Sequence, residues 1–488
     1  MAGALTALSH SDEVEAKLMI SQSSAERHFN KCGSIIQEPV VEYTESRAVK
    51  DNSVVQAVLN RAQLTFQPEE FQLKTWNSIC NKDSVVLTAP CSSGKMLTAE
   101  LSVDIMRELT GVPDGVGLGI LPLSAIMRET IKKNKQVAFM TMEGDIESGE
   151  EGTEKICFSD TMENLVEGKY KVILGHVESL DSDQGRALLE ALEEKGQLVF
   201  VFIDEVHKFL PSQWGRDSFR KDMSVVPASV RTQTVAPWVP ILAMTATLTV
   251  GEVTEVKEML CIKDDKLVVI TSSPVQPQHK IYNVLRPNSF YRSVNGDPGT
   301  KELLDRLILR QFDNCIVKNS FQHFSRTIIF IKHIKEGIEI NDLLTYRYKS
   351  IPVFNRPWIF NHSGKKSVSS HKMEQLLENE TIQLIVCSPK LLMGVNLSKF
   401  RIAIMLGPYE AMADILQALG RTGRREEGGR ALSILYNCWN KTDLSRNTSN
   451  SVIDFCHTKK CLKSFSHKFF TGEDNIFGGY WCCSNCDE

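Results

Sequence analysis

A run of six apolar residues, Leu198–Ile203, leads directly into the acidic pair Asp204 and Glu205. Successive side chains of a strand point to opposite faces, so a strand without a polar position is buried on both faces. Such strands are typical of parallel sheets that carry helices on each side. Comparable runs occupy residues 85–88, 118–121, 171–174, 241–244, 327–331, 382–387, 402–406 and 431–435. The sequence therefore predicts an α/β fold.

The alternation of apolar runs with amphipathic stretches is interrupted by a segment rich in Ser, Pro and Gln at 271–279. This composition is typical of a linker. A chain of 488 residues also exceeds what one hydrophobic core usually supports. We expect a flexible polar extension at 1–50, α/β domains at 51–272 and 273–440, and a cysteine-rich module at 441–488.

The strand at 85–88 is followed by a loop that ends in Gly-Lys and then by an amphipathic stretch at 96–109. A strand, a loop ending in Gly-Lys and a helix form the plan of a P-loop, in which backbone amides and the lysine hold phosphates. The usual Ser or Thr after the lysine is Met96, and a thioether is a poor Mg²⁺ ligand. The candidate nucleotide-binding residues are Ala89, Pro90, Cys91, Ser92, Ser93, Gly94, Lys95 and Met96.

Acidic and basic groups follow later strands. Asp204 is placed to order Mg²⁺ at the carboxyl end of its strand, and Glu205 to orient and deprotonate an attacking water. In the second half of the chain, Arg421 and Arg424 lie three residues apart, on one face of a helical turn. An arginine that enters from a second domain could complete a phosphoryl-transfer site when the domains close.

These segments, together with Met-Thr-Ala-Thr at 244–247, occur in the order found in DExH-type superfamily-2 helicases. The chain resembles these proteins, and RecQ in particular, over about residues 60–488. The most discriminating segment is 212–220, which resembles the aromatic-rich loop with which RecQ proteins sense single-stranded DNA. Its aromatic rings and guanidinium groups suit base stacking and phosphate contacts. The candidate DNA-sensing residues are Trp214, Arg216, Phe219 and Arg220.

The resemblance implies two RecA-like domains with ATP between them. It places Gln72 on the adenine edge, and Gln417 with Arg421 and Arg424 at the γ-phosphate. The segments 121–127, 362–364 and 388–396 resemble further helicase motifs. In the last of these, Leu392 stands where the family has glycine.

Five of the thirteen cysteines lie in the last 33 residues, and they resemble the zinc module of the same family. A C-x-x-C pair with further cysteines suits tetrahedral thiolate ligation of Zn²⁺. We expect Cys461, Cys483 and Cys486 to be ligands, with Cys482 as the fourth and Cys456 as the alternative. Reduced cysteines without a metal would be the competing interpretation.

Charge and hydropathy add weaker constraints. The net charge of −4 neither supports nor excludes DNA, because local grooves can supply the contacts. No apolar run approaches the roughly 18 residues that cross a bilayer, and the amino terminus does not resemble a secretory signal or a transit peptide. We therefore expect an intracellular protein, in the nucleus if the source is eukaryotic and also in the cytoplasm.

We thus expect an ATP-dependent 3′-to-5′ DNA helicase or translocase that acts on single-stranded and forked DNA in repair or recombination, with ATP, Mg²⁺ and Zn²⁺ as cofactors. Because of Met96, a catalytically weakened scaffold that binds ATP and DNA is the first alternative. An RNA-directed DExH helicase is the second. The chain also stops where many RecQ proteins continue into a winged helix, so a truncated product is a further expectation.

Overall fold

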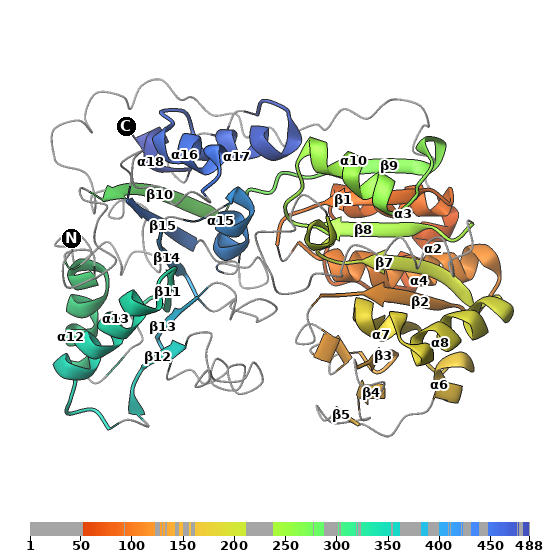
Figure 1. Cartoon of the computed structure of the whole chain (residues 1–488), viewed down its shortest axis with the longest axis horizontal. Coiled ribbons are helices and arrows are strands. Elements are labelled where there is room, and N and C mark those ends of the chain that lie inside the picture. Colours follow the sequence, from red (N-terminus) through yellow and green to blue (C-terminus); the bar gives the residue numbers. More distant parts are fainter. Residues whose placement is uncertain are drawn as a thin grey trace. The chain divides into compact units, whose positions relative to one another are not determined.

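The computed structural model describes most of the chain beyond the amino-terminal extension (Figure 1). The described residues are 52–122 except 92, 127–141 except 129, 132 and 133, 146–149, 156–157, 162–210, 238–286 except 277, 301–361 except 302, 303, 319, 321–323, 353 and 354, 382–388, 400–422 except 408, 410 and 421, 431–438, and 448–487 except 476 and 478–481. The chain forms two compact units, which part between Pro274 and Val275. The predicted flexible extension lies outside the described residues.

The first unit is built on a nine-stranded sheet in the order β5-β4-β3-β6-β2-β7-β8-β1-β9. Only β4 pairs antiparallel with its neighbours; the other pairs are parallel. The strands are β1 (Ser84–Thr88), β2 (Val116–Ile120), β3 (Val137–Met140), β4 (Ile146–Gly149), β5 (Ile156–Cys157), β6 (Val172–Gly175), β7 (Leu198–Ile203), β8 (Ile241–Thr245) and β9 (Leu267–Thr271).

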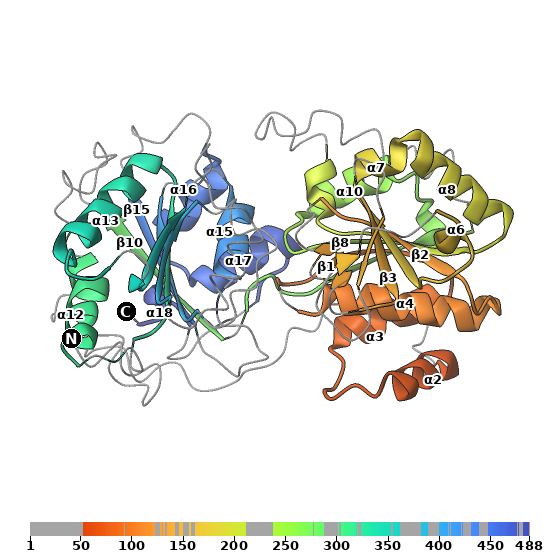
Figure 2. The same ribbon diagram turned by 90° about the horizontal axis from the view of Figure 1, so that it is seen from below.

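Helices cover both faces of this sheet, as Figure 2 shows. The side chains of β1, β7 and β8 alternate between two buried cores, one shared with α3 and α4 and the other with α6, α7, α8 and α10. The helices are α2 (Ser53–Ala62), α3 (Glu70–Cys80), α4 (Lys95–Thr110), α6 (Met162–Val166), α7 (Val177–Asp181), α8 (Asp183–Glu194) and α10 (Val250–Met259).

The strand order brings the expected chemistry to one edge. β8 pairs with both β1 and β7, with Thr88 opposite Thr245 and Ile203 opposite Ala243. The carboxyl ends of parallel strands lie at the same edge of a sheet, where ligands of α/β folds bind. The loop after β1 and the acidic pair after β7 therefore flank the end of β8.

The second unit has a six-stranded, all-parallel sheet in the order β10-β15-β14-β11-β13-β12. The strands are β10 (His279–Arg286), β11 (Thr327–Ile331), β12 (Trp358–Asn361), β13 (Leu384–Cys387), β14 (Ile402–Leu406) and β15 (Ala431–Cys438). Its helices are α12 (Arg310–Val317), α13 (Ile334–Arg347), α15 (Met412–Leu419), α16 (Asn450–His457), α17 (Leu462–Thr471) and α18 (Ser484–Asp487).

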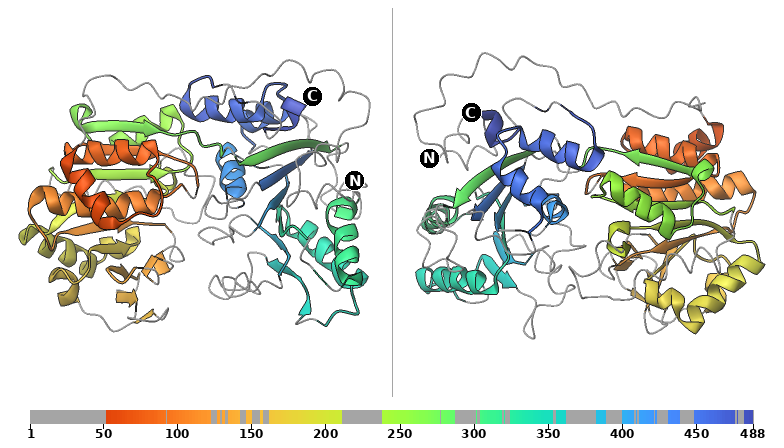
Figure 3. Two further views of the ribbon diagram at one scale, coloured as in Figure 1. Left: turned by 180° about the vertical axis from the view of Figure 1, so that it is seen from behind. Right: turned by 45° about the horizontal axis from the view of Figure 1, so that its top comes forward.

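One face of this second sheet packs against α12 and α13, and the other against α15, α16 and α17 (Figure 2). The cysteine-rich carboxyl-terminal helices lie over β10 in Figures 1 and 3. Cys483 forms a parallel bridge with Ile281 of β10, and the Ile281 amide donates to the Cys482 carbonyl at 3.2 Å. The cysteine-rich segment thus shares a core with the second sheet.

The parallel α/β architecture confirms the predicted fold class. The sequence pattern did not reveal β3, β4, β5, β9, β10 or β12. Strand β9 has partly exposed side chains, and β10 begins with polar residues, so neither resembles a fully buried run. Both enter the segment that we took for a linker. Among the described helices, none has the length and apolar character to span a bilayer.

Candidate active site and metal centre

The loop after β1 enters α4 through Gly94. This residue has φ +88°, in the left-handed region that glycine adopts without strain. A Cβ atom built on it would lie 2.9 Å from the Gln72 side-chain nitrogen. The backbone conformation of the turn therefore favours a glycine before Lys95, and a larger residue would also displace the end of the Gln72 side chain.

Lys95 is the first residue of α4, and its ammonium group turns back over the loop. Its Nζ donates to the carbonyl oxygens of Ala89 at 3.0 Å and Pro90 at 2.8 Å, and the Ser93 hydroxyl donates to the same Pro90 oxygen at 2.8 Å. A helix amino terminus with unpaired amides attracts anions. The ammonium group beside it adds the charge that a phosphate needs. The predicted loop residue Ser92 lies outside the described residues.

Gln72 of α3 is 1% exposed and supports the loop from behind. Its Nε2 donates to the Gly94 carbonyl and to the Thr98 hydroxyl, each at 3.3 Å, while its Oε1 accepts from the Glu69 amide at 2.9 Å. Both amide hydrogens thus have protein acceptors. The structure ties Gln72 to the P-loop, and its role at the adenine edge stays a prediction.

Met96 is the second residue of α4, at the position where the usual P-loop carries a hydroxyl. Its half-buried side chain packs against the core between α3, α4 and the sheet. The nearby Thr98 hydroxyl donates to the Gly94 carbonyl at 3.0 Å, so it is used to close the turn. The other described hydroxyl beside the lysine, that of Ser93, likewise donates to a loop carbonyl, that of Pro90.

The acidic pair follows directly after β7. The Asp204 amide donates to the Ile120 carbonyl of β2 at 3.0 Å, which extends the sheet pairing past the strand end. Asp204 and Glu205 are 7% and 8% exposed. Glu205 has φ +50°, a conformation that is uncommon for a residue with a Cβ and clusters at functional sites.

The hydroxyl of Thr245, at the end of β8, connects the acidic pair to the P-loop strand. It lies 2.7 Å from His207 Nδ1 and 3.5 Å from Glu205 Oε2, and it accepts from the Thr247 amide at 3.2 Å. The Thr245 carbonyl accepts from the Ala89 amide at 3.0 Å. One residue thus contacts the P-loop through its backbone and the acidic turn through its side chain.

Burial lowers the pKa of His207, and the neighbouring Glu205 carboxylate opposes this effect only partly. The imidazole is therefore neutral near pH 7, with one nitrogen as donor and the other as acceptor. A neutral ring fixes the orientation of the Glu205 side chain, 3.4 Å from Nδ1, without neutralising its charge.

In the second unit, Gln417 is buried on α15 and Thr422 is fully buried just beyond this helix. The Thr422 amide and hydroxyl both donate to the Leu419 carbonyl, at 3.3 and 3.1 Å. These bonds hold Thr422 against the end of α15. Arg421 and Arg424 lie outside the described residues, as do Trp214, Arg216, Phe219 and Arg220.

Four cysteine sulfurs form a cluster in the carboxyl-terminal helices: those of Cys461, Cys482, Cys483 and Cys486 all lie within 4.8 Å of one another. The sulfur of Cys461 is 3.4 Å from that of Cys482 and 3.8 Å from that of Cys483, which is 3.6 Å from that of Cys486. A tetrahedral ion with Zn–S bonds of about 2.3 Å separates its sulfurs by about 3.8 Å, whereas a disulfide needs about 2.05 Å. The donor set fits a tetrahedral metal.

The surroundings of Cys461 favour a thiolate. Cys461 caps the amino terminus of α17, where the helix dipole favours negative charge, and the neighbouring thiols lower the pKa of Cys461. The Leu462 amide donates to the Cys483 sulfur at 3.3 Å. The alternative ligand Cys456 does not belong to the cluster, and burial raises the pKa of its thiol.

Comparisons with known proteins identify the family. The DEAD/DEAH box helicase model matches residues 69–256, and the helicase conserved C-terminal domain model matches 306–426. ATP-dependent DNA helicase RecQ of Bacillus subtilis is 22% identical over 395 residues, which cover 77% of this chain and 58% of that protein. The chain belongs to the RecQ-like superfamily-2 helicases. This is a family of ATP-dependent DNA helicases, and the resemblance inferred from the motifs is confirmed.

Another RecQ-like relative, a protein of Caenorhabditis briggsae described as ATP-dependent DNA helicase Q1, is 24% identical over 384 residues. The match covers 76% of this chain and 54% of the relative. The chain therefore spans a little over half the length of these two relatives.

Solved helicase structures share the fold. The DUF1998 helicase MrfA, bound to DNA and AMPPNP, has a TM-score of 0.55 at 14% identity, over 87% of this chain and 58% of that one. The DEAD-box helicase Mss116, bound to single-stranded RNA and UDP-BeF, has a TM-score of 0.55 at 12% identity, over 83% and 80%. These likenesses confirm two RecA-like parallel-sheet domains.

Sequence reasoning missed the parts that His207, Thr245 and His279 play. His207 and Thr245 lie in motifs that we recognised, but their separation of 38 positions in the sequence hid their contact. His279, whose Nε2 lies 2.9 Å from the Thr422 carbonyl, carried no signal, because it falls in the segment that looked like a linker.

The Thr245 hydroxyl is testable by a matched pair of substitutions. Thr245→Val leaves the buried His207 ring and the Thr247 amide without this partner, so we expect the free energy of unfolding of the first unit to fall by about 1–3 kcal/mol. Thr245→Ser keeps the hydroxyl and loses one methyl group, which costs about 1 kcal/mol. Urea denaturation followed by tryptophan fluorescence compares them; a valine variant as stable as the serine variant would contradict the assignment.

Proposed function

We propose that this chain is an ATP-driven DNA helicase or translocase of the RecQ type. The observation that carries the proposal is the edge formed by β1, β8 and β7, where the P-loop and the acidic pair meet at Thr245. A phosphate-binding turn beside two buried carboxylates is what hydrolysis of a nucleoside triphosphate requires. We propose DNA as the nucleic acid because the family consists of DNA helicases.

In this proposal each group has a separate task. The Lys95 ammonium leaves the carbonyls of Ala89 and Pro90 to contact the β- and γ-phosphates. Glu205 accepts a proton from the attacking water, since its carboxylate is buried and held beside a neutral imidazole. Asp204 orders Mg²⁺, which would draw charge from the phosphate oxygens when bound.

Arginines of the second unit would complete the reaction. Gln417, Arg421 and Arg424 follow one another at the end of α15 and beyond it. We propose that they contact the γ-phosphate when the two domains close around ATP, so that an arginine stabilises the charge of the transition state. Gln72 would read the adenine edge in the same closed state.

The finer functional assignments are proposals by resemblance. The loop at 212–220 would report single-stranded DNA through Trp214, Phe219 and its two arginines. Movement would run 3′ to 5′ on single-stranded and forked DNA, in repair or recombination. If the source is eukaryotic, we propose residence in the nucleus.

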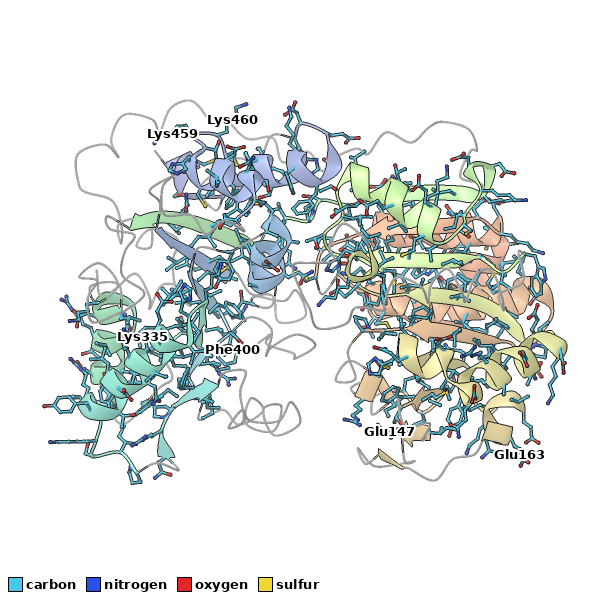
Figure 4. All side chains as sticks on the ribbon, in the orientation of Figure 1. Glu147, Glu163, Lys335, Phe400, Lys459 and Lys460 are labelled. Atoms are coloured by element: carbon cyan, nitrogen blue, oxygen red, sulfur yellow. The ribbon has the colours of Figure 1, made fainter. Side chains whose placement is uncertain are left out.

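We also propose that the cysteine cluster holds Zn²⁺. The sulfur spacing and the amide that donates to Cys483 support this ion. Lys459 and Lys460 lie at the exposed turn just before Cys461 (Figure 4), and Asn485 within the knuckle donates to the carbonyls of Thr458 and Lys460. A bound ion would therefore fix the knuckle and this basic turn together.

A second candidate function is a scaffold that binds ATP and DNA but hydrolyses ATP weakly. Met96 favours it, because its thioether takes the place of the hydroxyl that usually helps to hold Mg²⁺. The acidic pair and the arginines favour hydrolysis. An RNA-directed helicase has less support. The RNA helicase PRP5 of Kluyveromyces lactis is 23% identical, but over only 37% of this chain.

Steady-state ATP hydrolysis tests the proposal. The purified chain should hydrolyse ATP faster with single-stranded DNA than without it, and more than with single-stranded RNA. Glu205→Gln removes the general base, so the DNA-stimulated rate should fall by about 10²- to 10⁴-fold. The glutamine has nearly the same size, so binding of ATP and DNA should persist.

The outcomes separate the candidates. Hydrolysis that DNA stimulates and Glu205→Gln abolishes supports the motor. Binding of ATP and DNA without hydrolysis in either protein would establish the scaffold instead. Stimulation by RNA alone would favour the RNA-directed helicase.

Zinc content tests the cysteine assignment. We expect one zinc per chain by mass spectrometry, lost in Cys482→Ser and kept in Cys456→Ser, because only Cys482 lies in the cluster. Zinc affinity should fall as the pH decreases, since protons compete for the thiolates. Loss of zinc from the Cys456 variant, with retention in the Cys482 variant, would reverse the assignment of the fourth ligand.

A further inference from the structure

The imidazole of His279 ties the start of β10 to the turn between the two arginines. His279 is 3% exposed, and its Nε2 lies 2.9 Å from the Thr422 carbonyl oxygen. Its Nδ1 lies 3.4 Å from the Ser433 hydroxyl of β15. His279 thus contacts two residues that lie 143 and 154 positions further along the chain.

These contacts determine the tautomer. A carbonyl oxygen can only accept, so Nε2 carries the proton and donates to Thr422. Nδ1 is then the acceptor, and the Ser433 hydroxyl donates to it. Burial and the nearby Lys463 lower the pKa of His279 to about 4, so the neutral ring persists at physiological pH.

Thr422 is consequently held from two sides. Its amide and hydroxyl donate back to the Leu419 carbonyl at the end of α15, and its carbonyl accepts from His279. Arg421 precedes it directly and Arg424 follows two residues later. The His279 contact therefore restrains the Thr422 carbonyl, which lies between these two positions in the sequence.

The other end of this connection is also fixed. His279, Ile281 and Asn283 are alternate residues of β10, so their side chains face one side of the sheet. Ile281 packs in the core with Cys482 and Cys483, and the Asn283 side chain donates to the Cys456 carbonyl at 2.7 Å. The face that carries His279 is thus anchored by the cysteine-rich helices.

We propose that His279 is a positioning residue for ATP hydrolysis, which holds the Thr422 peptide so that Arg421 and Arg424 can reach the γ-phosphate. This inference rests on the proposed function. Misplacement of a reacting group by about 1 Å can cost about 10²-fold in rate. The arginines act mainly on the transition state, so the loss should appear in kcat and leave ATP affinity nearly unchanged.

A matched pair of variants tests the donor. His279→Leu fills the space but has no donor, whereas His279→Gln carries an amide nitrogen that can reach the Thr422 carbonyl. We expect the leucine variant to lower the DNA-stimulated kcat by roughly 10- to 100-fold. The glutamine variant should restore most of this loss, and binding of a non-hydrolysable ATP analogue should change less than about threefold in either. If the leucine variant does not fold, His279→Ala replaces it.

A double-mutant cycle separates positioning from general stability. In a background with Arg421→Ala and Arg424→Ala, His279→Leu should change the residual rate less than twofold, because the groups that it positions are absent. Equal rates for the leucine and glutamine variants, or a full effect in the arginine-free background, would overturn the positioning role while wild-type hydrolysis still supports the motor. A wild-type chain without hydrolysis would overturn both proposals.

Discussion

The hydrogen bonds at the carboxyl end of β8 connect the loop after β1 with the acidic turn after β7, and the proposed activity of the first unit depends on them. Thr245 accepts from the P-loop through its carbonyl and contacts Glu205 and His207 through its hydroxyl. Because β8 pairs with β1 on one side and β7 on the other, this one residue contacts both the loop after β1 and the acidic turn after β7. Glu205 has an uncommon backbone conformation at this turn, and burial keeps His207 neutral.

In the second unit, too, one residue at a strand end contacts a segment next to predicted functional residues. Here β10 is the edge strand, and its free side pairs with the cysteine knuckle at Ile281. Its first residue, His279, donates to Thr422 beside the predicted arginines. The cysteine-rich helices therefore complete the hydrophobic core over β10, the strand whose first residue contacts Thr422. In both units the end of a strand contacts a turn that adjoins groups expected to act on ATP.

Much of this arrangement could be predicted from the sequence, because buried strands and the loops after them have distinct patterns. The run Leu198–Ile203 and the loop at Gly94 indicated a parallel sheet and its functional edge. The cysteine spacing indicated a cluster and left its fourth member open, which the geometry assigns to Cys482 rather than Cys456. Contacts between distant residues could not be predicted: His279 is an isolated polar residue in sequence, and only the pairing of β10 with β15 brings it to Thr422. Likewise, the internal bonds of Gln72 depend on how α3 packs against α4.

The most direct test of the nucleotide site is the binding of a non-hydrolysable ATP analogue with Mg²⁺, measured by titration calorimetry on the wild type and on Lys95→Met. Methionine keeps the length and apolar stem of the lysine but removes its charge and donors. We predict one binding site per wild-type chain and an affinity at least about tenfold lower in the variant, equivalent to about 1.4 kcal/mol. Equal affinities, or a wild-type chain that does not bind, would contradict the assignment of this strand edge as the nucleotide site.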